Sequence, residues 1–312
     1  MKLLFVWTGV TSYMADCWRE LASRSGVELK VVIVRHASGS EIDVANVLQG
    51  FDVCVVDDGN LPELNGWAPD VVFAVGWRSV SVRRIIKNRQ LHSVPKVCCF
   101  DMPWRWELRC LFARWVLGGF LGRYDVAFVP GARASRYAKW LGFRKIYRGL
   151  FSLNAQRFNG IPGKKDFMFI GRNAPEKRID LLNEAYSLYR KMGGSWNFDI
   201  YGGSNFVQPS EVPGLYRNHA CLLLASSFDP WPLVMLEATA AGLAVVASHR
   251  CGNVDELGAR SVRYGDAQAM AAAMLEVERG EVRAAGRGVA QQYDSTAWAD
   301  RVQKICNDLI GR

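Results

Sequence analysis

The 312-residue sequence has no long hydrophobic run and no cysteine pair with zinc-site spacing. Its apolar stretches fall well short of the ~20 residues that span a bilayer, and the first, at residues 3–7, is too short for a signal peptide. None of the eight cysteines forms a Cys-x-x-Cys pair or a Cys/His cluster, so we expect no metal site. Several cysteines lie in apolar runs typical of buried, reduced thiols, which predicts a cytoplasmic protein.

Low-complexity tracts and short repeats are also absent. Half of the residues are hydrophobic and 22% are charged, which excludes a disordered chain and allows a sizeable core. At about 150 residues per domain, the length predicts two domains.

Acidic residues are scarce in one part of the chain. The formal net charge is +9, but residues 78–148 alone carry 16 Lys and Arg against three Asp and Glu. We expect this stretch to meet an anion, such as a phosphate, a nucleic acid or an acidic membrane surface. Nucleic acid is not expected, because zinc-finger spacing, RNA-binding aromatic signatures and helix-turn-helix patterns are missing.

Short apolar runs alternate with amphipathic segments, which predicts parallel sheets covered by helices on both faces. The expected strands are 3–7, 29–34, 53–56, 71–75, 96–100, 126–129, 167–170, 198–201, 221–225 and 244–247. The expected helices are 13–23, 79–89, 105–117, 132–141, 179–191, 210–216, 233–241 and 267–277. A Gly-, Pro- and Lys-rich stretch interrupts this alternation near residue 160, so we predict an α/β protein with domains 1–150 and 151–312.

The loop after the strand expected at 167–170 is basic. It begins at Gly171, and Arg172 and Lys177 lie five residues apart just before a helix. A guanidinium and an ammonium near a helix N-terminus suit a diphosphate. A solvated basic loop without a ligand is the alternative.

Two carboxylates, Asp229 and Glu237, are separated by seven residues. Asp229 lies in a proline-rich turn after a strand, and Glu237 lies inside the following helix. A carboxylate in such an apolar segment needs polar partners, and sugar hydroxyls would suit it. The alternative is a helix-capping Asp with a Glu in a surface ion pair.

Together these segments resemble the donor-binding half of retaining glycosyltransferases with the GT-B fold, in glycosyltransferase family 4 (glycosyl transferases group 1). The resemblance rests on Gly171-Arg172 with Lys177, on the Asp-x7-Glu pair inside Phe-Asp-Pro-Trp-Pro-Leu-Val-Met-Leu-Glu-Ala, and on the run Ala-Gly-Leu-Ala-Val-Val-Ala-Ser. It implies two Rossmann-like domains facing across a cleft. The N-terminal domain would bind the acceptor and the C-terminal domain the nucleotide-sugar donor, and the last helix, at about 296–309, would return to the N-terminal domain.

The resemblance also implies roles for individual residues. Arg172 and Lys177 would bind the diphosphate and stabilise the leaving group. Asp229 would contact the donor sugar, and Glu237 would accept a hydrogen bond from the ribose. The other implied substrate contacts are Gly171, Gly202, Gly203, Phe206, Val207, the backbone N–H groups of Leu233 and Val234, and Gly9 from the other domain. Asp101 is the polar residue nearest to the place where many members carry a catalytic histidine.

Among the departures from the family pattern, an Asp replaces the first Glu of the pair, and Pro232 stands where many members have Gly. The resemblance implies no metal or other cofactor, and UDP is the preferred nucleotide because it is frequent in the family. A non-catalytic nucleotide-sugar-binding relative and a GT-B sugar-nucleotide epimerase remain alternative functions.

The acceptor is expected to be a cell-surface glycan or a lipid-diphosphate-linked intermediate. In the helix expected at 105–117, Arg105 and Arg109 lie one turn apart among Trp, Leu and Phe. Such a basic, aromatic helix would suit an anionic membrane interface, which would place the protein peripherally on the inner face of the cytoplasmic membrane. The alternative is an ordinary helix whose apolar stripe faces the core.

Overall fold

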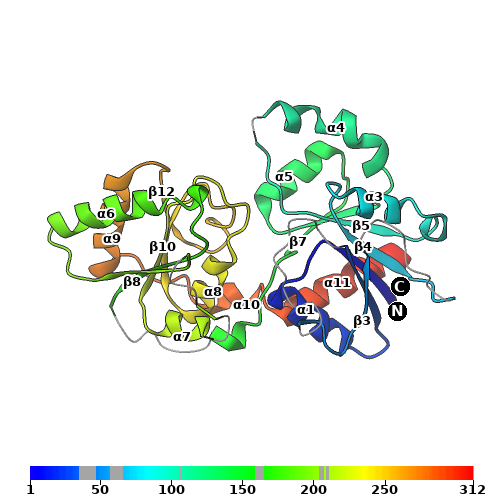
Figure 1. Cartoon of the computed structure of the whole chain (residues 1–312), viewed down its shortest axis with the longest axis horizontal. Coiled ribbons are helices and arrows are strands. Elements are labelled where there is room, and N and C mark those ends of the chain that lie inside the picture. The colour runs from blue at the N-terminus through cyan, green and yellow to red at the C-terminus, as the bar shows by residue number, and fades with distance from the viewer. Residues whose placement is uncertain are drawn as a thin grey trace. The chain divides into compact units, whose positions relative to one another are not determined.

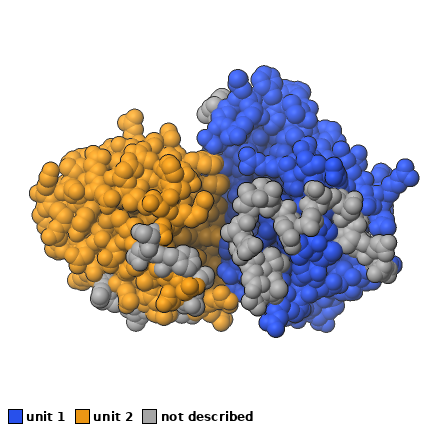
Figure 2. Space-filling model, viewed as in Figure 1, with its two compact units in different colours: residues 1–152, 295–312 blue, residues 153–294 orange. Residues whose placement is uncertain are grey.

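The computed structural model describes residues 1–34, 47–56, 66–105, 107–158, 165–203, 207–208 and 211–311. The chain divides into two compact units (Figure 2). Unit 1 consists of residues 1–152 and 295–312, and unit 2 consists of residues 153–294. The division lies two residues after the boundary expected from the sequence.

Unit 1 is built on a seven-stranded parallel sheet in the order β3-β2-β1-β4-β5-β6-β7. The strands are β1 (Lys2–Trp7), β2 (Glu28–Val34), β3 (Asp52–Val56), β4 (Val71–Val75), β5 (Lys96–Cys99), β6 (Val126–Val129) and β7 (Ile146–Arg148). The central strands are almost continuously apolar because helices cover both faces. The order reverses between β1 and β4, and this switch point is where open α/β sheets bind ligands.

Helices cover the sheet of unit 1 in two layers (Figure 1). One layer holds α1 (Ser12–Ala22) and α11 (Ser295–Ile310). The other holds α3 (Val80–Ile86), α4 (Leu108–Leu121) and α5 (Ala132–Leu141). In α11, the buried Trp298 donates its indole N–H to the carbonyl of Leu150 at 2.8 Å. The last helix therefore belongs to the core of unit 1.

The helix expected from residue 105 begins later, at Leu108. Glu107 has an extended backbone at the N-cap, so Arg105 precedes the helix. The expectation that Arg105 and Arg109 lie one helical turn apart is therefore wrong. Both guanidiniums instead pair with the carboxylate of Glu107, which lies between them in the chain.

Unit 2 is built on a five-stranded parallel sheet in the order β12-β11-β10-β8-β9. The strands are β8 (Phe167–Ile170), β9 (Phe198–Tyr201), β10 (Cys221–Leu224), β11 (Ala244–Ser248) and β12 (Arg260–Val262). The chain adds β9 on one side of β8 and the remaining strands on the other. The switch point of unit 2 therefore lies between β8 and β10.

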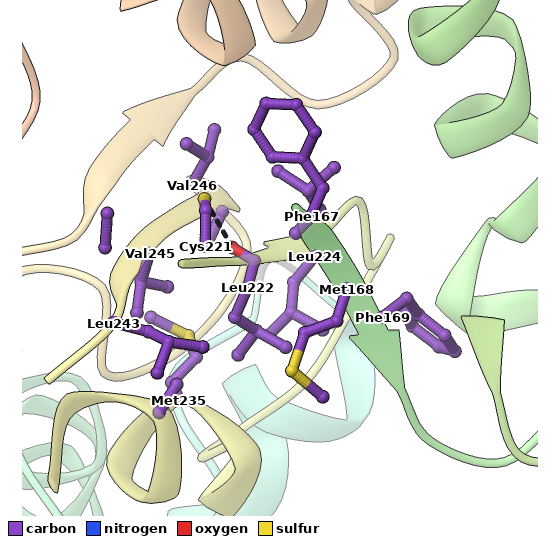
Figure 3. Close-up of a cluster of buried hydrophobic side chains, with 14 of the residues drawn as sticks. Phe167, Met168, Phe169, Cys221, Leu222, Leu224, Met235, Leu243, Val245 and Val246 are labelled. Carbon is purple, nitrogen blue, oxygen red and sulfur yellow. Dashed lines mark hydrogen bonds between the residues drawn. The ribbon is translucent and has the colours of Figure 1, made fainter. Parts of the chain in front are cut away.

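The helices of unit 2 form two groups (Figure 1). In one, α6 (Ile179–Lys191) packs on α9 (Ala267–Glu278); in the other, α8 (Leu233–Ala241) contacts α7 (Val212–Arg217) and α10 (Arg287–Gln291). Figure 3 shows Met235 of α8 gathered with buried side chains of β8, β10 and β11. Among the described residues of both units, no helix combines the length and the hydrophobicity needed to cross a bilayer.

Candidate active site

Two loops meet at the carboxyl ends of β8 and β10, the strands that flank the switch point of unit 2. Lys177 follows β8 and Asp229 follows β10, and Lys177 Nζ lies 2.5 Å from Asp229 Oδ2. The two side chains are only 16% and 12% exposed. Beside this pair, the backbone N–H of Ser227 donates to the carbonyl of Glu176 at 2.7 Å, which joins the two loops. A cation and a carboxylate are thus held where this type of sheet binds its ligands.

A strained backbone position follows Lys177 directly. The next residue, Arg178, has a φ of 53° and is the one non-glycine in the described ranges with a positive φ. Its guanidinium contacts the carboxylate of Asp180 at 2.8–3.0 Å and the hydroxyl of Tyr264 at 2.6 Å. These contacts offset a backbone cost of about 1–3 kcal/mol. The turn at Arg178 leads from the short 3-10 helix Pro175–Lys177 into α6.

The Asp229 loop is braced by the loop after β11. The carbonyl of Asp229 accepts from the backbone N–H of Gly252 at 2.8 Å, and Asn253 Nδ2 donates to the carbonyl of Pro232 at 3.0 Å. A Cβ at Gly252 would lie 1.7 Å from the carbonyl oxygen of Pro230, so no other residue fits there without moving the loop. Gly252 could not be identified from the sequence, because its partners come from another loop.

The glycines expected near the nucleotide lie together at the ends of β8 and β9. Gly202 has a φ of 114°, and a Cβ there would lie 1.8 Å from the carbonyl oxygen of Gly171. Gly203 follows Gly202, and Val207 is half-buried a few residues further on. The remaining residue of this predicted group, Phe206, lies outside the described residues.

The N-terminus of α8 adjoins the Asp229 loop. Leu233 and Val234 are its first two residues, and no side chain caps it at Pro232. The first N–H groups of a helix have no intrahelical acceptor and carry partial positive charge. This helix end can therefore receive an anion through the backbone, although Pro232 itself has no N–H to offer.

Glu237 lies one turn further along α8. Its Oε2 accepts a hydrogen bond from the hydroxyl of Tyr216 in α7 at 2.7 Å. Burial raises the pKa of Glu237, and the hydrogen bond from Tyr216 opposes that rise. Tyr216 could not be identified from the sequence, because nothing in the chain marks which tyrosine reaches this carboxylate.

The remaining predicted residues are Arg172 in unit 2 and Gly9 and Asp101 in unit 1. The Arg172 side chain is 83% exposed, and its nearest carboxylate is that of Glu176 at 3.6 Å. Gly9 lies between β1 and α1, beside the switch point of unit 1, and Asp101 follows β5. Both belong to unit 1.

Within the described part of the chain, no group of three His, Cys, Asp or Glu side chains lies close enough to hold a metal ion. The chemical groups of the site are one ammonium, two carboxylates and the backbone N–H groups at the start of α8. Such a set can bind a phosphate beside a polyhydroxylated molecule.

Comparison with known proteins identifies a family match in unit 2. Residues 204–279 match the family model described as glycosyl transferases group 1. This segment contains Asp229, α8 and Glu237. No curated protein sequence matches the chain.

Similar solved structures match the chain over almost its whole length. The lipopolysaccharide outer core galactosyltransferase WaaB has a TM-score of 0.70 at 14% identity, covering 97% of this chain and 98% of that one. Alr3699/HepE from Anabaena, in complex with UDP and glucose, has a TM-score of 0.70 at 15% identity, covering 99% and 100%. Sucrose-phosphate synthase from Thermosynechococcus elongatus has a TM-score of 0.73 at 13% identity, covering 100% and 99%.

At such low identity these structures establish the fold. The two parallel sheets and their helices match GT-B proteins, as the sequence resemblance implied. The chain therefore has the GT-B fold, and its residues 204–279 match the family model of glycosyl transferases group 1.

Proposed function

We propose that this protein is a retaining glycosyltransferase that moves a sugar from a nucleoside-diphosphate sugar to a glycan or a lipid-linked acceptor. The observation that carries the proposal is the Lys177–Asp229 pair at the switch point of unit 2, next to the uncapped N-terminus of α8. UDP is the proposed nucleotide, and the complex of the similar HepE with UDP and glucose supports it.

The reaction breaks the bond between the sugar C1 and the diphosphate oxygen, so negative charge develops on the leaving group. Fixed positive groups aimed at this charge stabilise the transition state more than the ground state. In this proposal, Lys177 and the N–H groups of Leu233 and Val234 supply them. Arg172 folds back from solvent onto the diphosphate when the donor binds.

The two carboxylates orient the donor. Glu237 accepts a hydrogen bond from the ribose, and Asp229 accepts from hydroxyls of the sugar. The acceptor hydroxyl attacks C1 on the face that the diphosphate leaves, and its proton passes to a phosphate oxygen of the leaving group. Asp229 therefore binds and orients the sugar and forms no covalent intermediate. We propose that these steps need no metal ion.

The acceptor side of the proposal rests on an exposed apolar face of α4. The exposed fractions are 72% for Leu108, 57% for Phe112, 67% for Trp115 and 78% for Val116. Their spacing places all four on one face of the helix, opposite the buried Cys110, Ala113 and Leu121. An exposed apolar patch of this kind marks an interaction site.

The basic residues in and near α4 in the sequence indicate an anionic partner for this face. Between residues 78 and 148, basic residues outnumber acidic ones by 16 to three. Exposed Trp and Phe flanked by Arg suit the interface of an anionic bilayer, where the rings enter the acyl boundary and the guanidiniums meet lipid phosphates. We therefore propose that the protein acts at the cytoplasmic face of a membrane, on a lipid-linked acceptor.

Nucleotide binding tests the proposal first. Melting temperatures of the wild type and of Lys177→Ala are measured with UDP, GDP, TDP and ADP. A ligand at a hundred times its Kd stabilises by about 2.7 kcal/mol, a shift of several degrees. We expect UDP to stabilise the wild type and to lose most of its effect on the variant. Equal shifts in both proteins would contradict the role of Lys177.

Turnover separates the proposed function from its alternatives. A glycosyltransferase releases UDP from a UDP-sugar and attaches the sugar to an added acceptor. An epimerase converts the donor without an acceptor, and a non-catalytic binding protein leaves the donor intact. Nucleotide binding without sugar transfer to any glycan or lipid-linked acceptor would contradict the proposal.

A further inference from the structure

Tyr216 and Glu237 form a buried pair between two helices of unit 2. Tyr216, in α7, is fully buried, and its ring packs edge-on against Phe158 with the centroids 5.7 Å apart. Its hydroxyl lies 2.7 Å from Glu237 Oε2 and 3.4 Å from the carbonyl oxygen of Val234. The carboxylate distance is the better hydrogen-bond length, so the single hydroxyl proton is directed at Glu237.

This contact leaves the two oxygens of Glu237 in different situations. Oε2 is satisfied by Tyr216, whereas the described residues offer Oε1 no hydrogen-bond donor. A carboxylate has about four acceptor positions, so Oε1 can accept from a ligand. Because Tyr216 is packed on all sides, its hydroxyl fixes which oxygen of Glu237 faces inward.

We infer that Tyr216 is a positioning residue that holds Oε2 of Glu237 so that Oε1 is presented to one hydroxyl of the nucleotide ribose. The inference rests on the proposed function, because it assumes that Glu237 meets a nucleotide. Tyr216 itself touches no substrate. Without Tyr216, the Glu237 carboxylate would sample several rotamers, and its ordering would reduce the binding free energy. With Tyr216, the carboxylate is already ordered before the ligand binds.

A purely structural role is the competing explanation, since a buried carboxylate needs a hydrogen-bond partner in any case. The two roles differ in how they depend on the ligand. A positioning role affects only those ligands that carry the ribose hydroxyl, whereas a structural role affects every ligand of the site equally.

The experiment measures the dissociation constants of UDP and of its 2′-deoxy, 3′-deoxy and 2′,3′-dideoxy forms by calorimetry. The proteins are the wild type, Tyr216→Phe and Tyr189→Phe. Tyr216→Phe keeps the ring against Phe158 and removes one oxygen. Tyr189→Phe is the matched control, because Tyr189 is also fully buried in unit 2 and its hydroxyl bonds a different carboxylate, Glu278.

We expect Tyr216→Phe to weaken UDP binding about tenfold, as for loss of an oriented hydrogen bond to a charged group. The loss should disappear for the dideoxy form and for one of the two monodeoxy forms, and Tyr189→Phe should bind like the wild type. An equal loss for all four ligands, or no loss for UDP, would overturn the inference while the proposed function stands. A wild type that binds no uridine nucleotide would overturn both.

Discussion

Lys177 Nζ and Asp229 Oδ2 lie 2.5 Å apart, so the cation proposed for the diphosphate and the carboxylate proposed for the sugar are already paired. Their loops come from neighbouring strands and are tied together by Ser227 and Glu176. Both side chains are largely buried. Moving either one away would leave the charge of the other unpaired in an apolar environment, which is unfavourable. The pair therefore holds the two side chains against each other at the site before the donor arrives.

The first prediction concerns this pair. Lys177→Ala and Asp229→Asn should each lower the transfer rate by at least about a hundredfold, because each removes a group that acts on the donor. Lys177→Ala should also lower the free energy of unfolding by about 1–3 kcal/mol, since it leaves a buried carboxylate unpaired. Steady-state kinetics and urea unfolding measure the two effects.

A double variant completes that test. Because the two side chains contact each other, the losses in stability should be clearly non-additive in the protein that carries both substitutions. Lys191→Ala, at the exposed end of α6, is the control and should behave like the wild type. Strict additivity would show that the pair does not act as a unit.

The second prediction concerns the exposed face of α4. The double variant Phe112→Ser and Trp115→Ser should reduce binding to phosphatidylglycerol vesicles at least tenfold, because two large aromatic side chains no longer leave water. Co-sedimentation at low salt measures binding, and neutral phosphatidylcholine vesicles should bind less of the wild type. Met192→Ser, an exposed apolar residue of unit 2, should leave binding unchanged. Equal binding by all three proteins would contradict the membrane proposal.

The third prediction is a pH dependence. Burial raises the pKa of Glu237, so this carboxyl takes up its proton at a higher pH than an ordinary glutamate. The protonated form is a weaker acceptor for a ribose hydroxyl, so UDP affinity should fall as the pH is lowered through that pKa. Tyr216 opposes the rise in pKa, and Tyr216→Phe should therefore move the fall to a still higher pH. Calorimetric titrations across the acidic range should give profiles that differ in this direction; coincident profiles would contradict it.

The fourth prediction concerns the loop that supports Asp229. Gly252→Ala should lower both the transfer rate and the melting temperature, because its Cβ would collide with the carbonyl of Pro230. In the matched substitution Gly288→Ala, in α10, the Cβ meets nothing within 4 Å beyond its chain neighbours and the backbone of its own helix, so it should be neutral or slightly stabilising. Activity assays and thermal melts compare the two, and a Gly252→Ala protein with normal activity would show that the loop tolerates displacement.

The fifth prediction concerns metal removal. In the proposed mechanism the charge on the leaving group is met by Lys177 and the N-terminus of α8. Exhaustive treatment with EDTA should therefore leave the transfer rate unchanged, and added Mg²⁺ or Mn²⁺ should not raise it. If EDTA abolishes activity and either ion restores it, a metal ion stabilises the charge on the leaving group, and the proposed mechanism is wrong on this point.

Much of the fold was predictable because buried parallel strands are short, continuous apolar runs. The runs at 71–75, 126–129 and 167–170 mark β4, β6 and β8 to the residue. The edge strands β7 and β12 were missed, since each has only three residues and neither is a continuous buried apolar run.

The site was predictable only in part. The sequence singles out Lys177 and Asp229, but their direct contact depends on how two strands pair and on the turn at Arg178. In α4, composition alone could not tell an inward from an outward apolar face, because apolar residues occur around most of the helix. Tyr216 lies 21 residues before Glu237, and only the packing of α7 on α8 relates them.

The place of α11 has a consequence for how the chain folds as it is made. Its residues Trp298, Val302 and Ile305 complete one side of the core of unit 1, yet they are synthesised after all of unit 2. Unit 2 is continuous in sequence and can fold as soon as it leaves the ribosome, whereas unit 1 must wait with an uncovered sheet face. Although its strands are synthesised first, we therefore expect unit 1 to complete its packing after unit 2.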